Sequence, residues 1–116
     1  MREKYTFHKR RDKAERIYIT YNMFVPVYAS ISGSNAIFRF LVKRATPLSV
    51  LMFTIRKKTK MDASSGLFLM IEKEDSDGKV SAIMANTNDD MNYIHNKYVN
   101  KDGFIYIKIQ KESVFG

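Results

Sequence analysis

The sequence contains no cysteine and only two histidines, His8 and His95, among its 116 residues. The absence of cysteine excludes disulfide bonds, thiol nucleophiles, cysteine-based zinc sites and iron–sulfur clusters. Two histidines are too few for a histidine-rich metal site. No apolar run approaches the roughly 18 residues that cross a bilayer. The start MREKYTFHKRRDK lacks the apolar stretch of a secretory signal, so we expect a cytosolic or nuclear setting.

Patterns typical of catalysis are also missing. The five glycines are isolated, which excludes a glycine-rich phosphate loop, and no serine lies in a G-x-S-x-G elbow. Four carboxylates cluster at Glu72, Glu74, Asp75 and Asp77, but they do not match the calcium-loop pattern and indicate a solvated hairpin tip. We therefore predict that the protein is not an enzyme and needs no metal or cofactor.

The charge of +8 is unevenly distributed along the chain. Residues 1–60 contain 14 basic and 3 acidic side chains, whereas residues 61–116 contain 6 basic and 9 acidic ones. A strongly basic half indicates an anionic partner, which could be nucleic acid, a membrane or an acidic peptide. Composition alone does not choose among the three.

The first half of the chain predicts a helix followed by a hairpin. The first 22 residues have apolar side chains at helical spacing beside a basic face, and residues 24–31 alternate as a strand does. Pro26 predicts that this strand lies at a sheet edge or that Pro26 lies at its start, because proline donates no ladder hydrogen bond. A turn at 32–35 leads to a second strand at 37–42, which predicts an antiparallel hairpin.

The second half predicts a long helix and further strands. We expect Thr46 to cap the helix and Pro47 to occupy its first position, before a helical stripe that ends in the basic run 56–58. Residues 67–72 predict a buried strand and residues 104–109 an alternating one. Between them, 80–84 is a weaker strand candidate, and Asp89 or Asp90 can cap a short helix at 91–98.

This order favours an α+β fold, the ubiquitin-like β-grasp, in which a four-stranded mixed sheet packs on a central helix. The N-terminal helical extension would occupy 1–22 and the β-grasp domain 23–116, with a flexible tail from about 111–116. A ferredoxin-like βαββαβ order fits less well, because a hairpin precedes the first long internal helix.

Two features suggest functions. A β-grasp chain that ends in Gly116 has the terminus of a ubiquitin-like modifier, since glycine can thread a narrow active-site cleft. The strand 37–42, flanked by Arg39, Lys43 and Arg44, could accept an acidic extended peptide along a free sheet edge.

Nearly the whole chain contributes to a family resemblance, through the segments KYTF, KRRDKAERI, VPVYA, RFLV, TIRKKTKM, LFLMIE and DGFIYIKIQKESVFG. With these segments the chain resembles the autophagy-related ubiquitin-like modifiers, the GABARAP and light-chain-three family. The resemblance implies two N-terminal helices on a ubiquitin core. It also implies ATP-dependent activation of Gly116, passage through activating and conjugating enzymes, and conjugation to phosphatidylethanolamine, with a cysteine protease for processing and deconjugation.

Family members also bind aromatic-x-x-aliphatic peptide motifs of cargo receptors by strand addition. By resemblance, the aromatic pocket maps to Ile17, Pro26, Arg39, Leu41 and Phe104. The aliphatic pocket maps to Phe40, Val42, Thr46, Leu51 and Thr54. The implied protein is a monomer in the cytoplasm that joins the autophagosome membrane as a lipid conjugate.

The sequence departs from the family pattern at several positions. Lys13 replaces a common acid beside the aromatic pocket, Lys43 replaces a usual proline, and Thr46 and Thr54 replace aliphatic residues. The loop after LFLMIE is also longer than usual. Two alternatives stay open: a modifier conjugated to a protein instead of a lipid, and a small basic nucleic-acid-binding protein, although nucleic acid is not the partner we expect.

Overall fold

The computed structural model describes residues 6–59 and 66–111. Three helices and five strands follow one another in these residues. Their bounds are α1 (Phe7–Thr20), β1 (Phe24–Ile31), β2 (Ile37–Lys43), α2 (Leu48–Thr59), β3 (Leu67–Glu74), β4 (Val80–Met84), α3 (Met91–Tyr98) and β5 (Ile105–Lys111). The helix predicted in the first 22 residues is therefore confirmed as α1, and within the described residues before β1 it stands where the resemblance implied two helices. Of the predicted tail at about 111–116, Lys111 belongs to β5, while residues 112–116, like residues 1–5, lie outside the described residues.

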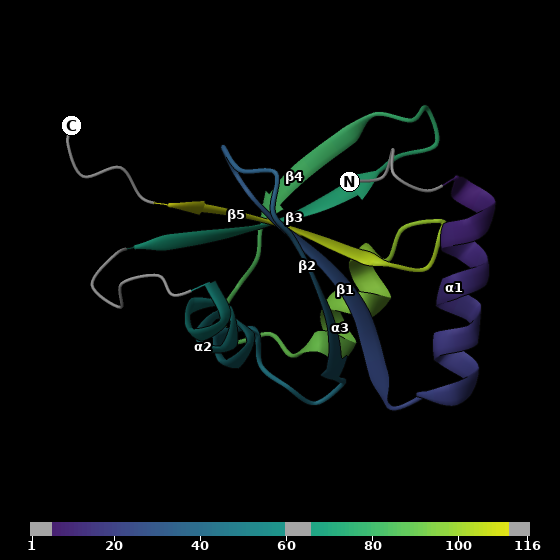
Figure 1. Cartoon of the computed structure of the whole chain (residues 1–116), viewed down its shortest axis with the longest axis horizontal. Coiled ribbons are helices and arrows are strands. Elements are labelled where there is room, and N and C mark those ends of the chain that lie inside the picture. The colour runs from purple at the N-terminus through teal and green to yellow at the C-terminus, as the bar shows by residue number, and fades with distance from the viewer. Residues whose placement is uncertain (1–5, 60–65, 112–116) are drawn as a thin grey trace.

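The strands form one mixed sheet in the order β2-β1-β5-β3-β4 (Figure 1). β1 runs antiparallel to β2 and parallel to β5, and β3 runs antiparallel to both β5 and β4. The predicted hairpin and β-grasp arrangement are confirmed. The four-strand count is wrong, because residues 80–84 pair with β3 as a fifth strand at the far edge.

The predicted edge position for the strand that contains Pro26 is also wrong. β1 lies between β2 and β5, so it is an interior strand. Pro26 is tolerated there because the parallel ladder with β5 begins only at Val27, opposite Ile105. The missing N–H of Pro26 thus precedes the hydrogen bonds that β5 makes.

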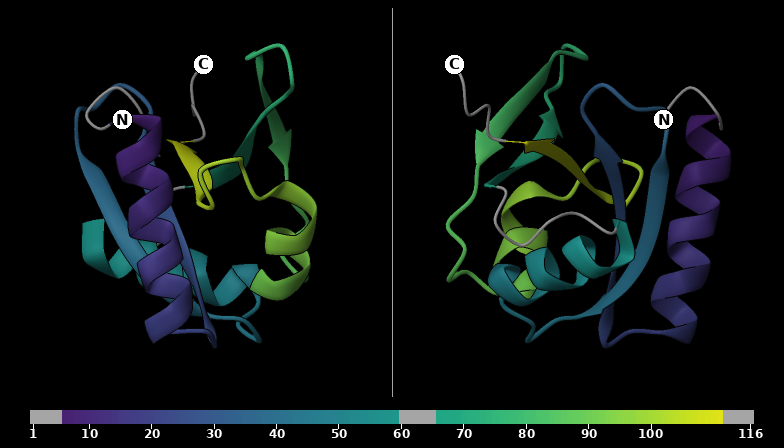
Figure 2. Two further views of the ribbon diagram at one scale, coloured as in Figure 1. Left: turned by 90° about the vertical axis from the view of Figure 1, so that its right-hand side faces the viewer. Right: turned by 60° about the vertical axis from the view of Figure 1, so that its left-hand side comes forward.

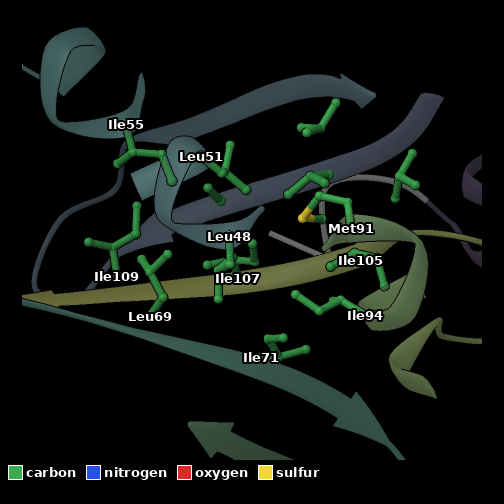
Figure 3. Packing of buried hydrophobic residues seen from close by; sticks show 14 of the residues in the cluster. Leu48, Leu51, Ile55, Leu69, Ile71, Met91, Ile94, Ile105, Ile107 and Ile109 are labelled. Carbon is green, nitrogen blue, oxygen red and sulfur yellow. The ribbon is translucent and has the colours of Figure 1, made fainter. Parts of the chain in front are cut away.

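The main core lies between the sheet and helices α2 and α3, which cover the same face (Figures 1 and 2). Alternating side chains of β1, β3 and β5 meet the apolar stripe of α2, as Figure 3 shows. The labelled core residues are Leu48, Leu51, Ile55, Leu69, Ile71, Met91, Ile94, Ile105, Ile107 and Ile109. The buried strand predicted at 67–72 is confirmed as β3, and its buried side chains Leu67, Leu69 and Ile71 lie on one face while Phe68 is exposed on the other.

The start of α2 differs from its sequence prediction. Pro47 lies just before the first helical residue and forms a bridge with Asp90. Carbonyl groups of the loop before α3 accept the first helical N–H groups: Asp89 O accepts from Leu48, and Thr87 O accepts from Ser49. The cap therefore comes from a segment some 40 residues away in sequence, and not from Thr46. The predicted cap of α3 is confirmed, because Asp90 accepts from Tyr93 N at 2.9 Å.

Helix α1 packs on the opposite face of the sheet and forms a second, smaller core (Figure 2). Ala14 of α1 is buried against Tyr28, Phe104 and Tyr106. The closest approach is to Gly103, where an added Cβ would lie 2.8 Å from the Ala14 Cβ. Small side chains at both positions therefore let the helix rest directly on the turn before β5.

A buried carboxylate fixes α1 in this position. Asp102 accepts a hydrogen bond from Arg10 Nε at 2.8 Å, from Phe104 N at 3.1 Å and from the Tyr106 hydroxyl. The Arg10 and Asp102 side chains are only 13% and 4% exposed. A buried ion pair depends on further hydrogen bonds to its charged groups, and Asp102 receives two of them, from Phe104 N and the Tyr106 hydroxyl.

The turn at Gly103 gives a test of the α1 contact. Gly103 and Gly78 both have positive φ, 90° and 81°, but only Gly103 faces a close neighbour. Alanine costs about 1–2 kcal/mol in such a conformation, and forcing Ala14 away should add about 1–3 kcal/mol. Urea unfolding should show a larger loss of stability for Gly103→Ala than for the control Gly78→Ala, and equal losses would contradict this packing.

Candidate functional site

An apolar pocket opens where α1, β1 and β2 meet, on the face that carries the smaller core. Its volume is about 140 Å³. A cavity of about 150 Å³ lined by apolar side chains is known to hold benzene, so this pocket has room for one aromatic ring. The lining residues are Lys13, Ile17, Pro26, Val27, Tyr28, Arg39, Phe40, Leu41 and Phe104.

The strand register builds the floor of the pocket. Pro26 lies opposite Leu41, and Tyr28 lies opposite Arg39, in the antiparallel pairing of β1 and β2. Residues two apart in a strand point to the same face, so both pairs lie on the α1 side of the sheet. Ile17 lines the pocket on the side of α1, and Phe104 lines it just before the start of β5.

All five residues predicted for the aromatic pocket line this one space. Lys13, whose replacement of a common acid was noted in the sequence, also lines it. Sequence reasoning missed the contributions of Val27, Tyr28 and Phe40. Tyr28 could have been found from the alternation of β1, since it lies two residues after Pro26 on the same face.

The strand beside the pocket has a free edge. Among the strands of residues 6–59 and 66–111, β2 is the terminal one, with β1 as its one neighbour. Arg39, Leu41 and Lys43 are exposed on it. An extended peptide can add to such an edge through main-chain hydrogen bonds, while its alternate side chains enter adjacent pockets.

The five residues predicted for the aliphatic pocket are brought together less completely. Val42 and Leu51 belong to the main core, against which Phe40 also packs. Thr46 is half-buried, and its carbonyl accepts a hydrogen bond from Met91 N. Thr54 is exposed on α2, where its hydroxyl donates to the Val50 carbonyl at 3.1 Å. These five side chains therefore do not line one pocket. At the junction of β2 and α2, Phe40 is the partly exposed apolar side chain among them.

Lysines of α2 lie over aromatic rings, one on β2 and one on α2 itself. Lys58 Nζ lies 5.4 Å from the centre of the Phe40 ring, and Lys57 Nζ lies 5.3 Å from that of Phe53. Phe53 is 62% exposed and was not predicted from the sequence. These lysines and aromatic rings suit a partner that carries both carboxylates and apolar side chains.

A hydrogen-bonded chain joins α1 to α3 and to the end of β2. The Tyr18 hydroxyl donates to the Gly103 carbonyl, so it must accept from His95 Nε2, which lies 2.6 Å away. The other ring nitrogen, Nδ1, is then free to accept from Arg44 Nη1 at 3.4 Å. These directions assign the neutral Nε2–H tautomer to His95.

The electrostatics agree with a neutral histidine. Burial, together with the adjacent Arg44 guanidinium, lowers the pKa of His95 below its ordinary value of 6.5. Burial also raises the pKa of Tyr18 to about 12, which keeps its hydroxyl proton available for Gly103. A second proton on His95 would face Arg44 and would remove the acceptor that the guanidinium uses.

Other classes of site are not found in the residues that the structure describes. Within 6–59 and 66–111, no group of three or more His, Asp or Glu side chains could hold a metal ion. No helix in these ranges is long and apolar enough to span a membrane. Gly116, the predicted conjugation residue, lies outside the described residues.

Comparison with known proteins identifies the family. A profile described as "Autophagy protein Atg8 ubiquitin like" matches residues 9–116, which is nearly the whole chain. The chain belongs to the Atg8 family. Members of this family are ubiquitin-like modifiers that act in autophagy, and they are not enzymes.

Individual relatives support the same assignment. Autophagy-related protein 8 of Kluyveromyces marxianus is 27% identical over 120 residues, which cover 99% of this chain and 90% of the relative. That of Cochliobolus heterostrophus is 25% identical, with 99% and 93% covered. The crystal structure of Trypanosoma brucei ATG8 superposes with a TM-score of 0.74 at 24% identity, covering 97% of this chain and 93% of that one. This superposition confirms the ubiquitin-like β-grasp fold that the sequence predicted.

The neutral state of His95 predicts how stability depends on pH. Since the pKa of His95 is lower in the folded chain, the unfolded chain binds more protons below about pH 6.5. Its contribution to stability is therefore complete above that value and is lost as the pH falls toward the folded pKa. Urea unfolding at about pH 7.5 and about pH 5 should show a smaller pH-dependent loss for His95→Gln than for the wild type.

The second histidine provides the control for this experiment. His8 lies exposed on α1, so His8→Gln should keep the wild-type dependence on pH. If the unfolding free energy of His95→Gln falls as much between about pH 7.5 and about pH 5 as that of the wild type, protonation of His95 does not cause the loss of stability.

Proposed function

We propose that this Atg8-family chain is conjugated through Gly116 to phosphatidylethanolamine and recruits cargo receptors that carry aromatic-x-x-aliphatic motifs. The observation that carries the proposal is the apolar pocket beside the free edge of β2. A peptide strand added along β2 would place an aromatic side chain over Pro26 and Leu41. Main-chain hydrogen bonds would supply affinity that is independent of sequence.

Charge supports an acidic peptide as the ligand. Arg39 and Lys13 line the pocket, and Lys43 continues the basic row along β2. Lys58 of α2 lies over the Phe40 ring of β2, near where the aliphatic residue would dock. Acidic residues that flank the motif would therefore meet positive charge at both ends, which mainly raises the association rate and the specificity.

The expected affinity for the peptide is that of a reversible adaptor. Burying an aromatic side chain of about 200 Å² at about 25 cal/mol/Å² contributes roughly 5 kcal/mol before costs. Ordering of a flexible peptide and loss of its translational freedom offset part of this gain. Two anchors and the strand hydrogen bonds should leave a dissociation constant of about micromolar. Many lipid-linked copies on one membrane would strengthen binding by avidity.

The proposal implies defined partners and locations. Activating and conjugating enzymes would charge Gly116, and a cysteine protease would process or release the conjugate. The chain would exchange between the cytoplasm and the autophagosome membrane. A modifier attached to a protein is the second candidate, because a terminal glycine serves either acceptor.

The pocket is tested by substitution on β2. Leu41→Ala should weaken binding of an acidic aromatic-motif peptide by roughly tenfold, since it removes apolar surface that the peptide would cover. Ile37→Ala is the matched control, because Ile37 is exposed on the same strand and face but does not line the pocket. Calorimetric titration measures both, and equal affinities of the two variants would remove Leu41 from the site.

The terminus is tested by reconstitution. Wild-type chain incubated with ATP, the family's activating and conjugating enzymes and phosphatidylethanolamine liposomes should give a lipidated form of altered gel mobility. Gly116→Ala should abolish it because the added methyl group obstructs the catalytic clefts, whereas the control Ser113→Ala should not. Persistent lipidation of Gly116→Ala would contradict the proposal, and an adduct to a protein without any lipid adduct would support the second candidate.

A further inference from the structure

A further apolar hollow lies where β2 ends, and we call it the end hollow. Its volume is about 380 Å³, and it is lined by Met23, Phe24, Lys43, Arg44 and Ala45. The surface exposed within it is apolar, although two of its five lining residues are basic. Long charged side chains often line a surface with their methylene stems while the charged group stays in water. The end hollow therefore offers apolar surface to an approaching side chain.

Two large side chains supply most of this apolar character. Met23 is 66% exposed, so much of its surface is open to a ligand. Phe24 is half-buried, and its ring meets that of Tyr21 edge to face, with the ring centres 6.2 Å apart. Because Tyr21 caps the C-terminus of α1, this contact holds Phe24 on the side of the sheet that α1 covers.

The strand register places the end hollow next to the aromatic pocket. Phe24 lies opposite Lys43, and the next pair on the same face is Pro26 with Leu41, at the floor of that pocket. Residues two apart in a strand are separated by about 7 Å. The end hollow therefore continues the floor of the aromatic pocket by one step toward the end of β2.

A peptide strand added along β2 would repeat this spacing. The aromatic pocket takes Arg39 and Leu41 from this part of the chain, whereas the residues mapped to the aliphatic pocket extend to Thr46. A motif whose aliphatic residue follows its aromatic residue therefore fits best when it runs parallel to β2. The second residue after the aromatic one then returns to the α1 face, one step along, at the end hollow.

We propose that the end hollow is a specificity subsite that takes an aliphatic side chain at the second x of a bound aromatic-x-x-aliphatic motif. This inference rests on the proposed function, in which the aromatic residue occupies the neighbouring pocket. The apolar surfaces of Met23 and Phe24 would be covered by that aliphatic side chain, which removes them from water.

An acidic side chain at the same position would gain less from the basic residues of the end hollow. Arg44 Nε donates to the Asn22 carbonyl at 3.0 Å, and Arg44 Nη1 lies 3.4 Å from Asn92 Oδ1. This guanidinium is therefore directed toward groups of its own chain. Lys43 is exposed, and an ion pair in water contributes little to binding. Apolar burial thus decides the preference at this position.

Four acidic aromatic-motif peptides test the subsite by calorimetric titration against the full chain. The reference peptide has alanine at the second x and also two residues before the aromatic one. Two peptides replace the first of these alanines by leucine or by aspartate, and the fourth has leucine only at the earlier position. We expect leucine at the second x to bind about fivefold more tightly than the reference, and the other two peptides to remain within about twofold of it.

Met23→Ala is the decisive variant, because it removes exposed apolar surface from the end hollow. It should lower the leucine-to-alanine affinity ratio from about fivefold to about twofold and leave binding of the reference peptide unchanged. Met84→Ala is the matched control, since Met84 is 60% exposed on β4, at the opposite end of the sheet. This control should keep the wild-type ratio.

Each contrary outcome identifies a different error. Equal binding of the leucine and reference peptides, or an unchanged ratio in Met23→Ala, would overturn the subsite while leaving the aromatic pocket as the peptide site. Tighter binding of the aspartate peptide than of the leucine peptide would assign the position to Lys43 and overturn an apolar preference. A gain from leucine at the earlier position would show that the peptide runs the other way along β2, and would also overturn the inference. If the reference peptide does not bind the wild type, the proposed function fails and this inference fails with it.

Discussion

The buried Asp102 carboxylate is the point on which the candidate site depends. It accepts from Arg10 of α1, from the backbone at Phe104 and from Tyr106 of β5, so one side chain joins the helix, the turn and the sheet. One wall of the pocket, Ile17, comes from the same helix. The ion pair therefore does more than hold a terminal helix in place. It joins to the turn before β5 the same helix that supplies Ile17 to the pocket.

Much of this architecture could be predicted from local patterns. Helical spacing identified α1 and α2, alternation identified β1 and β5, the turn at 32–35 led to β2, and Asp90 marked the start of α3. The aromatic-pocket residues were mapped by family resemblance, and the register of β1 and β2 brings three of them, Pro26, Arg39 and Leu41, to one face. Once Pro26 and Leu41 are paired, the neighbouring residues of each strand have fixed faces. Where periodicity is strong, the sequence therefore specified both the element and its exposed side.

The remaining features depend on distant parts of the chain. β4 is exposed along its whole length, so with no buried face the strand at 80–84 gave only a weak signal in the sequence, and its pairing with β3 needed the assembled sheet. The start of α2 is capped by carbonyl groups of the loop before α3, and no local sequence motif predicts a cap from so distant a segment. Val42 and Leu51 were mapped to a surface pocket, but the core takes most of their surface. The Tyr28 hydroxyl is buried without a hydrogen-bond partner among the described residues, which no local pattern in the sequence predicts.

The open edge of β2 has a consequence for crowded surfaces. An unpaired strand is a template for association between identical chains as well as for a ligand. Two copies that met edge to edge along β2 would bring their Arg39 and Lys43 side chains together, and like charges on paired strands repel. At the other end of the sheet, the edge is a strand of five residues beside an acidic turn. Where many copies are concentrated, self-repulsion thus keeps the basic edge vacant, so that the same charges which exclude another copy admit an acidic peptide.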